Sequence, residues 1–393
     1  MLFSRKMKNS KSINPLPFVY YYVPVVFLTI AGLIDSIYLS VSHFRVYTDI
    51  GYKSFCAVSR SFNCDTVSQS PYSIFLDIPV PVWGTIGYLF FLFVLIAAKR
   101  TDNPRKHFWG FLFLIALVFS VISLFLAYIS IFLIRSYCIM CMVSFAVNFL
   151  LLFFTWLICK RFGPQGLFAW AKNDLNYFIA RKNLVLFMLL AFSGMVTTGF
   201  MIPDYWEMDA QHTSVELKKG MTEDGHPWVG AEDPELTITE FTDYRCFQCK
   251  KMHYYLRALV RENEDRIRLV HKHFPMDHKF NPLVKKPYHV GSGTLALFSI
   301  YAQDQGKFWE ANDIFFKLKK SINVINIKTI AEKLDLGPKA LAYARYDRSI
   351  RYRLQKDIEK GLELGFTGTP SYVINDEIFQ GHIPSRILKQ YID

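Results

Sequence analysis

The chain has 393 residues, 52% of them hydrophobic, and a formal net charge of +12 at pH 7. Water-soluble proteins rarely contain so large an apolar fraction, which indicates segments that face lipid. The basic residues form no patch interleaved with aromatic side chains, so the charge gives no reason to expect nucleic-acid binding.

Five apolar segments, each of about 20 residues, are long enough to form helices that cross a bilayer. They cover residues 18–41, 81–98, 108–134, 137–158 and, more weakly, 184–202, and no sixth follows Pro203. The first is too long for a cleavable signal peptide, and no small-residue cleavage site follows it. The N-terminal half is therefore predicted to be an all-α membrane bundle.

Lysine and arginine residues are concentrated in the flanks on one side of these segments. They precede the first span, link the second to the third, and link the fourth to the fifth: Arg5, Lys6, Lys8, Lys11, Lys99, Arg100, Arg105, Lys106, Lys160, Arg161, Lys172, Arg181 and Lys182. Because basic flanks stay in the cytoplasm, the N-terminus is expected there. Residues 45–80, the turn around Arg135 and everything after Pro203 are then expected on the outer side.

Six of the seven cysteines form three close pairs that this topology places on the outer side, where disulfides persist. The pairs are Cys56 with Cys64, Cys138 with Cys141, and Cys246 with Cys249. Cys159 alone falls at the cytoplasmic edge and is expected to be a lone reduced thiol.

The part of the chain after a polar linker alternates between strand and helix patterns. ELTITEFTDY predicts a strand and KKMHYYLRALVREN an amphipathic helix, so Cys246 stands at a helix N-terminus. There the helix dipole and free N–H groups lower the pKa of a thiol. RIRLVHKHF predicts a second strand, residues 287–362 a helical tract, TPSYVINDEIFQG two strands about an Asn-Asp turn, and Ser385 the start of a final helix.

This order of elements resembles the thioredoxin superfamily, and specifically its DsbA-like oxidoreductases, over residues 227–393. Glu240 stands where these proteins keep a buried carboxylate beneath the active site, and Thr369-Pro370 matches their cis-proline. The resemblance implies an α/β thioredoxin-like domain with a helical insertion. It also implies that Cys246 meets the substrate, Cys249 is the resolving thiol and Glu240 carries the proton.

Two other interpretations of Cys246 and Cys249 remain open. A zinc site would need two further ligands. His271 and His273 alternate along a strand and could be proposed for them, although surface or packing roles are commoner. A structural disulfide is the other interpretation, but so short a loop restrains little of the unfolded chain.

Residues 18–158 resemble the vitamin K epoxide reductase family. The resemblance rests on Cys56 and Cys64 in an exposed loop, CDTVSQS with Ser70, IPVPVWG before the second span, and Cys138 and Cys141 one helical turn apart in SYCIMCMVSF. Bacterial members are often fused through a fifth span to a thioredoxin-like domain. The whole chain resembles such a fusion, with a four-helix core plus a fifth span.

The family resemblance implies a quinone, ubiquinone or menaquinone, held within the four-helix bundle. By position, Cys141 would face the quinone, Cys138 would exchange with Cys64, and Cys56 would meet the soluble domain. A quinone dissolves in hydrocarbon and a substrate protein does not, so a relay between them needs a mobile dithiol between two fixed ones.

Three further residues are candidates for the quinone pocket. The resemblance implies that Ser70 helps to line it, and Tyr72 lies close by in the sequence. Asp35 is an ionisable residue within the first span, where such residues often have a function. A polar residue bonded to a neighbour near the outer surface explains Asp35 equally well.

The predicted order is a cytoplasmic segment 1–17, a quinone-reducing membrane domain 18–158, a cytoplasmic loop 159–183, a fifth span 184–202, a linker 203–226 and the thioredoxin-like domain 227–393. The expected function is a thiol oxidase of the bacterial cytoplasmic membrane that forms disulfide bonds in reduced exported proteins and passes electrons to the quinone pool. It is expected to act as a monomer without metal or nucleic acid.

Two rival functions belong to different classes. An outward conduit of reducing power feeding an isomerase-like domain would need thiols reachable from the cytoplasm, and only Cys159 qualifies. A membrane-anchored redox sensor or chaperone would bind exposed cysteines without turnover.

Overall fold

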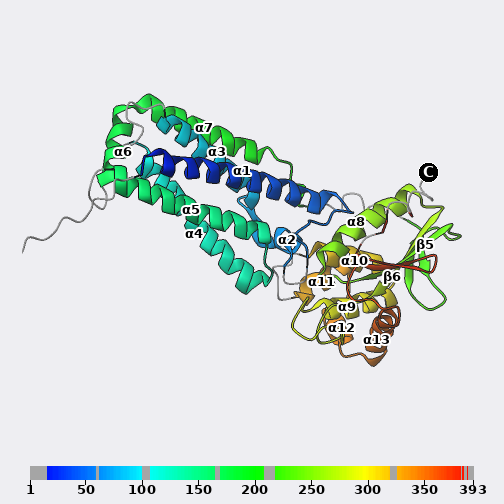
Figure 1. The fold of residues 1–393 in the computed structure, drawn as a ribbon. Helices are drawn as coiled ribbons and strands as arrows, with labels where there is room; N and C mark the ends of the chain where they lie inside the picture. The colour runs from blue at the N-terminus through cyan, green and yellow to red at the C-terminus, as the bar shows by residue number, and fades with distance from the viewer. Residues whose placement is uncertain are drawn as a thin grey trace, which may run out of the picture. The chain divides into compact units, whose positions relative to one another are not determined.

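A computed structural model describes residues 16–58, 62–99, 107–163, 169–207, 217–318, 325–381, 383–384 and 387. The chain divides into two compact units, Met1–Phe44 with Ser54–Asp204, and Arg45–Lys53 with Tyr205–Asp393 (Figure 1). The helix predicted to open at Ser385 lies outside the described residues. So do residues 1–15 and 208–216 and the basic residues Arg100, Arg105 and Lys106.

Five helices of the described part of the chain are long and apolar enough to cross a membrane, as the sequence predicts. They are α1 (Val19–Thr48), α3 (Val80–Lys99), α4 (Trp109–Tyr128), α5 (Ile139–Phe162) and α7 (Lys182–Phe200). A π-helical turn, Ile129–Ile134, extends α4. The main difference from the prediction is α1, which continues seven residues beyond position 41 because its polar C-terminal end is still compatible with a helix.

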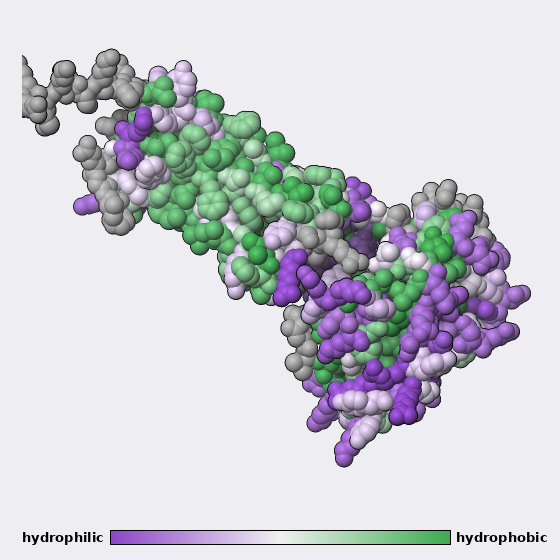
Figure 2. All heavy atoms as spheres, turned by 60° about the horizontal axis from the view of Figure 1, so that its bottom comes forward, coloured by the Kyte–Doolittle hydropathy of each residue, from purple (hydrophilic) through white to green (hydrophobic). Residues whose placement is uncertain are grey.

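The membrane-type helices pack through a continuous apolar core in the first unit. Val25, Phe91, Leu112 and Leu151 are fully buried in it. Gly32 of α1 permits a close approach to α3, because a Cβ atom there would come within 2.3 Å of the ring of Tyr88. Apolar side chains also cover the visible outer face of this unit (Figure 2), as expected of helices that face lipid.

Short elements connect these helices. Between α1 and α3 lie α2 (Cys64–Ser68), a 3-10 turn (Pro71–Ser73) and the paired strands β1 (Ile74–Phe75) and β2 (Ile78–Pro79). Helix α6 (Ala169–Ala180) lies within residues 159–183, where the sequence predicts a loop. Its Asp174 accepts hydrogen bonds from Phe108 N (2.9 Å) and Phe111 N (3.1 Å), which satisfies free N–H groups at the start of α4.

The second unit is built on a six-stranded sheet. Its strands are β3 (Lys219–Met221), β4 (Pro227–Gly230), β5 (Leu236–Thr242), β6 (Ile267–His273), β7 (Ser371–Ile374) and β8 (Glu377–Gln380), in the spatial order β3-β4-β6-β5-β7-β8. β5 and β6 are parallel and α8 (Phe247–Glu262) joins them, while the other pairs are antiparallel. The predicted strands are confirmed, and β3 and β4 are additional.

The described residues between β6 and β7 form five helices, which correspond to the predicted helical insertion: α9 (Ser292–Asp304), α10 (Phe308–Lys317), α11 (Ile327–Leu334), α12 (Pro338–Ala344) and α13 (Arg348–Glu363). β5 is buried on both faces. Ile238 joins a core that includes Leu256 of α8, whereas Phe241 joins the core of the insertion. The α/β thioredoxin-like architecture with a helical insertion is therefore confirmed.

Candidate redox site

Cys246 is the N-cap of α8, directly after β5 and a short turn. Its backbone N–H donates to the carbonyl oxygen (3.0 Å) and to Oδ1 (3.1 Å) of Asp243. Its Sγ lies 3.4 Å from the carbonyl oxygen of Thr369, and the Thr369-Pro370 peptide bond is cis. The structure thus brings together the predicted cysteine pair and the predicted Thr-Pro, which are more than 120 residues apart in the sequence.

The two thiols of this pair are polarised in opposite directions. A hydrogen bond from Cys249, opposed by burial and supported by the nearby His289, lowers the pKa of Cys246 to about 6. Burial and the neighbouring Cys246 thiolate raise the pKa of Cys249 well above its usual range. At neutral pH Cys246 is therefore the nucleophilic and leaving sulfur, and Cys249 holds the proton that must be removed before it can attack.

Asp243 organises the start of α8, and the sequence analysis missed it. Its Oδ1 accepts hydrogen bonds from Arg245 N (2.6 Å) and Cys246 N. Its Oδ2 accepts from Met276 N (2.6 Å) and pairs with His289 Nδ1 at 3.1 Å. An aspartate three residues before the first cysteine, at the start of a predicted helix, is the signal that could have identified it.

Glu240 lies on β5, on the same face as Thr242, which is a near neighbour of the Cys249 thiol. Burial raises the pKa of Glu240 to about 7. Its Oε1 lies 2.9 Å from Nδ1 of His271. A carboxyl group with this pKa can take up and release a proton near neutral pH.

The two histidines proposed as zinc ligands have other partners. His271 and His273 are 1% and 4% exposed, so a surface position is excluded. His271 contacts Glu240 and His273, and the second nitrogen of His273 contacts Ser299. Among the described residues, no three His, Cys, Asp or Glu side chains are grouped so that they could hold a metal ion.

The other two cysteine pairs lie in the first unit, and each forms a disulfide, Cys56–Cys64 and Cys138–Cys141. The sequence predicts an exposed loop for the first pair. Phe55 and Val58 of this loop are exposed, but Cys56 and Cys64 themselves are buried, at 0% and 2% exposed. Both are buried with Cys138 and Leu39 in one apolar cluster. The loop folds onto the bundle instead of standing free in solvent.

Backbone pairing brings Cys64 to Cys138. Phe62 and Tyr137 form a parallel β-bridge, and Asn63 N donates to Tyr137 O at 3.0 Å. The residues that follow this bridge are the first residue of α2, Cys64, and the N-cap of α5, Cys138. The bridge therefore places Cys64 near Cys138, the cysteine with which the family resemblance implies that it exchanges.

A cavity of about 220 Å³ opens inside the helix bundle next to Cys141. Its walls come from α1, α3, α4, α5 and the segment between α1 and α3, and they are mainly apolar. Ser70 and Tyr72, proposed for the quinone pocket, line it together with Cys141. Polar groups on the wall include Tyr88, whose hydroxyl donates to Asn148 Oδ1 at 2.6 Å.

Asp35 does not line this cavity. Its buried carboxylate accepts a hydrogen bond from Ser144, which does line it. Ser144 lies one helical turn after Cys141 on α5. The apolar wall, a few polar groups and one redox-active sulfur suit a flat hydrophobic molecule such as a quinone.

Comparison with known proteins assigns the two units to families. Residues 23–156 match the model of the Vitamin K epoxide reductase family, and residues 222–393 match a model described as Thioredoxin. The chain carries one domain of each family. The three cysteine pairs are divided accordingly, two in the vitamin K epoxide reductase (VKOR) domain and one in the thioredoxin domain.

Individual relatives match parts of the chain. Disulfide bond formation protein D of Bacillus subtilis is 24% identical over 191 residues, which cover 43% of this chain and 76% of that protein. The Na(+)/H(+) antiporter NhaA 3 of Salinispora tropica is 23% identical over 152 residues, 39% of this chain, and the chain spans only 22% of the antiporter's length. The family matches support thiol-disulfide oxidoreductase chemistry.

Among solved structures, a thioredoxin-like oxidoreductase from Silicibacter pomeroyi DSS-3 is 23% identical, with a TM-score of 0.37, and covers 44% of this chain and 92% of that one. The alpha-DsbA1 of Wolbachia pipientis is 16% identical, with a TM-score of 0.36, and covers 44% of this chain and 93% of that one.

Proposed function

We propose that the chain is a quinone-dependent thiol oxidase of the bacterial cytoplasmic membrane that forms disulfide bonds in exported proteins. The observation that carries this proposal is the arrangement in the VKOR domain, where Cys64 and Cys138 share one buried cluster and Cys141 lines an apolar cavity. A dithiol placed between a second dithiol and a hydrophobic cavity suits transfer of electrons from sulfur to a lipid-soluble acceptor.

In the thioredoxin domain, a substrate thiolate attacks Sγ of Cys246 in the oxidised pair, and Cys249 leaves as a thiolate that takes up a proton. A second substrate thiolate then attacks the mixed disulfide, so that the substrate gains a disulfide and Cys246 leaves. The low pKa of Cys246 favours both its attack and its departure.

In the relay, the Cys246 thiolate attacks Cys56 of the Cys56–Cys64 disulfide, and Cys249 resolves the mixed disulfide once it has lost its proton. The Cys64 thiolate next attacks Cys138, and Cys56 resolves that bond, leaving Cys138 and Cys141 as a dithiol. Each exchange forms one sulfur–sulfur bond and breaks one, so two electrons move inward per substrate disulfide.

The cavity residues Ser70, Tyr72 and Cys141 would hold the quinone, ubiquinone or menaquinone. A bound quinone supplies the oxidising capacity, because it accepts two electrons and two protons. Ser70 donates its hydroxyl to Val67 O at 2.8 Å, which leaves its oxygen free to accept a hydrogen bond. Asp35 supports the wall through Ser144.

The basic residues of the short flanks support a cytoplasmic N-terminus and a thioredoxin domain on the extracytoplasmic side. Reduced exported proteins would be the substrates, and the chain would act as a monomer. Apart from the quinone, the proposed reaction uses only sulfur chemistry and needs no metal.

The test uses the full chain in lipid nanodiscs with a reduced dithiol peptide and a quinone. We expect one quinone to be reduced for each peptide disulfide formed, over many turnovers, as read from quinone absorbance and peptide mass. Reduction of a disulfide peptide at the expense of a quinol would establish the outward conduit instead. Binding of the peptide without turnover would establish a sensor or chaperone.

A further inference from the structure

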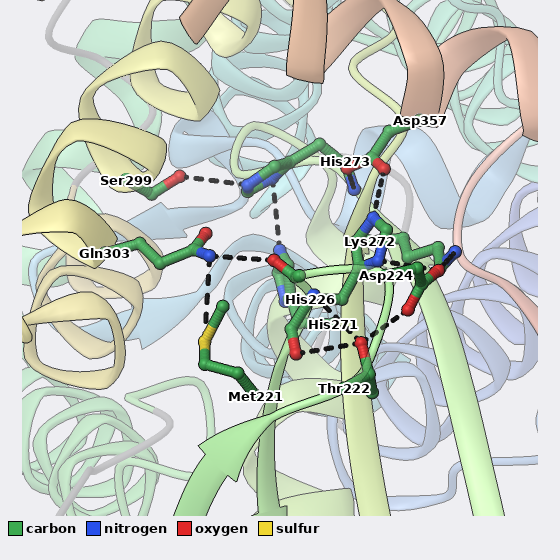
Figure 3. A network of polar contacts seen from close by, with 11 residues as sticks. Met221, Thr222, Asp224, His226, His271, Lys272, His273, Ser299, Gln303 and Asp357 are labelled. Carbon is green, nitrogen blue, oxygen red and sulfur yellow. Dashed lines mark hydrogen bonds and ion pairs between the residues drawn. The ribbon is translucent and has the colours of Figure 1, made fainter.

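The thioredoxin domain contains a second, polar pocket of about 210 Å³. Its lining includes Asp224, His226, His271, His273 and Asp357 (Figure 3). These side chains come from β6, from α13 and from the turn between β3 and β4. The pocket therefore reaches two histidines of the central sheet, one of which contacts Glu240.

A continuous line of hydrogen bonds leads from Glu240 to this pocket. Glu240 Oε1 lies 2.9 Å from His271 Nδ1, and His271 Nε2 lies 3.2 Å from His273 Nδ1. His273 Nε2 lies 3.2 Å from Ser299 Oγ, whose hydroxyl is 2.8 Å from Ala296 O. Every ring nitrogen of the two histidines has a partner in this line.

The line is complete for both protonation states of Glu240. When Glu240 is protonated, it donates to His271, His271 donates to His273, and His273 donates to Ser299. When Glu240 is ionised, His271 Nδ1 and His273 Nδ1 donate in the opposite direction, and His273 Nε2 is an acceptor. The two arrangements differ by one proton, which has left from Nε2 of His273.

Both imidazole rings must be neutral to pass a proton along the line, because a doubly protonated ring has no acceptor nitrogen. Burial lowers the pKa of His271 to about 3 and that of His273 well below its usual range, so both rings are neutral at pH 7. A neutral ring that accepts at one nitrogen and donates at the other can pass a proton without moving.

The pocket that His273 lines is surrounded by charged groups, which are not themselves part of the line of ring contacts. Asp357 accepts from His273 N at 2.9 Å, and its other oxygen lies 2.7 Å from His226 Nε2. His226 Nδ1 lies 3.0 Å from Asp224, whose side chain is 60% exposed and also pairs with Lys272. Other titratable or charged groups that act on Glu240 or the two histidines are His253 and Arg257 of α8, Tyr244 after β5, Arg353 of α13 and Tyr372 of β7.

The inner end of the line reaches the cysteine pair. Tyr372, which pairs with Glu240 across β5 and β7, lies within electrostatic range of both Glu240 and Cys249. Its buried hydroxyl has no hydrogen-bond partner in the described structure. Thr242, two residues after Glu240 on the same face, lies near Cys249, and its hydroxyl also has no hydrogen-bond partner in the described structure.

We propose that His271 and His273 form a proton path along which the proton of Cys249, taken up by Glu240, leaves for solvent at the polar pocket. This inference rests on the proposed function, in which Cys249 must lose a proton to resolve each mixed disulfide. The Cys249 S–H bond breaks, its thiolate attacks Cys246, and the bond from Cys246 to its partner sulfur breaks. The proton passes from Glu240 to His271 Nδ1 as His271 Nε2 releases one to His273, which releases one to solvent.

The test isolates this step in the full chain with the other five cysteines replaced by alanine, so that Cys246 and Cys249 are its only thiols. The reduced chain is mixed with 5,5′-dithiobis(2-nitrobenzoate), which releases one coloured thiolate when Cys246 attacks and a second when Cys249 resolves. The rate of the second release is followed across the pKa of Glu240, about 7. No quinone or substrate protein takes part, so a chain that fails to reduce quinone still gives this result.

We expect the second release to accelerate as the pH rises through about 7. His271→Gln should slow it by about tenfold or more below about pH 7, where Glu240 is protonated and must first release its own proton along the line, and free imidazole in the buffer should restore most of the rate. His226→Gln is the matched control, because His226 lines the same pocket but bonds neither Glu240 nor His271. Its rate and pH profile should remain those of the parent.

An unchanged rate in His271→Gln, an equal loss in His226→Gln, or a loss that imidazole does not restore would overturn the path. His273→Gln interrupts the same line one residue further on and should behave like His271→Gln. The parent chain supplies a measurement that needs no further substitution. In mixtures of H₂O and D₂O, a curved dependence of the second rate on deuterium content reports several protons in transfer, and a linear dependence contradicts the proposal.

Discussion

Two Cys-x-x-Cys motifs in this chain have the same local geometry and different surroundings. Cys138 is the N-cap of α5 and Cys246 the N-cap of α8, both with extended backbone angles. In the VKOR domain the motif lies in an apolar cluster and its second cysteine lines an apolar cavity. In the thioredoxin domain it lies near the charged side chains of Asp243 and His289.

This difference shows that the motif sets the positions of its two sulfur atoms, whereas the neighbouring groups set the reactivity of the thiols and the kind of partner that suits them. A helix N-terminus favours a thiolate at either site. The thioredoxin domain adds charged groups, and there Cys246 has the lowered pKa of a nucleophile while Cys249 keeps its proton. The VKOR motif has hydrocarbon neighbours and a cavity instead, which suit a lipid-soluble partner. Its two residues between the cysteines, Ile139 and Met140, are apolar, whereas Gln248 in the other motif is polar.

The largest effect is expected from Cys141→Ala, which removes the cavity-facing sulfur. Quinone reduction by the full chain should be abolished, while the oxidised Cys246–Cys249 pair should still oxidise one equivalent of peptide. Quinone absorbance and peptide mass measure the two results. Cys159→Ala removes a buried thiol outside the three pairs and is the control. Continued turnover in Cys141→Ala would show that the two motifs do not have the separate tasks assigned to them.

Cys249→Ala tests the link between the two domains. Because the resolving thiol is missing, Cys246 should accumulate in a mixed disulfide with a substrate protein or with Cys56. Mass spectrometry of non-reduced digests identifies the bond. If Cys56 and Cys64 remain bonded only to each other, the buried loop pair is a structural disulfide and the relay does not pass through it.

Glu240→Gln tests the charged surroundings of the thioredoxin motif. Removal of the base should slow the second thiolate release by about tenfold to a hundredfold and abolish its rise through pH 7. Glu235→Gln, an exposed residue paired with Arg266 at the surface, is the matched control. A pH profile that is unchanged in Glu240→Gln would assign the rise to another group.

Glu240→Gln should also stabilise the thioredoxin domain. Folding raises the pKa of Glu240 from 4.5 to about 7, so the natural chain loses stability as the pH rises through this interval. Gln cannot ionise and avoids this loss, which amounts to up to about 3 kcal/mol at higher pH. Slower hydrogen exchange of the β5 and β6 amides above pH 7, but not below pH 4.5, is the expected result. Equal exchange rates in Glu240→Gln and in the parent chain at both pH values would contradict this prediction.

The smallest effect is expected from Ser70→Ala in the cavity next to Cys141. Loss of one hydrogen-bond acceptor in the cavity should raise KM for the quinone by about fivefold, with kcat little changed. Ser193→Ala on α7, which does not line the cavity, is the control. A fall in kcat with KM unchanged would indicate that Ser70 acts on the sulfur instead of on the acceptor.

Short-range patterns in the sequence predict much of this protein. Apolar length alone locates five spans, and β-branched runs locate β5, β6, β7 and β8. The spacing of the cysteines gives three pairs, and two of these form the expected disulfides. These features are predictable because each depends on residues close together in the chain.

What the sequence failed to predict depends on contacts between distant residues. Cys56 and Cys64 of the predicted exposed loop are buried, and the loop is joined to the start of α5 by pairing of Phe62 with Tyr137, 75 positions later in the chain. His271 and His273 have the alternating pattern of an ordinary strand, and nothing local reveals that they contact Glu240 and Ser299.

The sequence by itself determined most of the elements, the number of spans and the identity of the sulfur pairs, because hydrophobic length, strand pattern and helix capping act over a few residues. The tertiary structure alone decided which cysteine lines a cavity, which carboxyl group is buried to a pKa near 7, and which histidines lead from it to a pocket. These properties follow from burial and from distances between side chains far apart in the chain. Electrostatic and hydrogen-bond energies depend on those distances and on the exclusion of water, which only the folded chain defines.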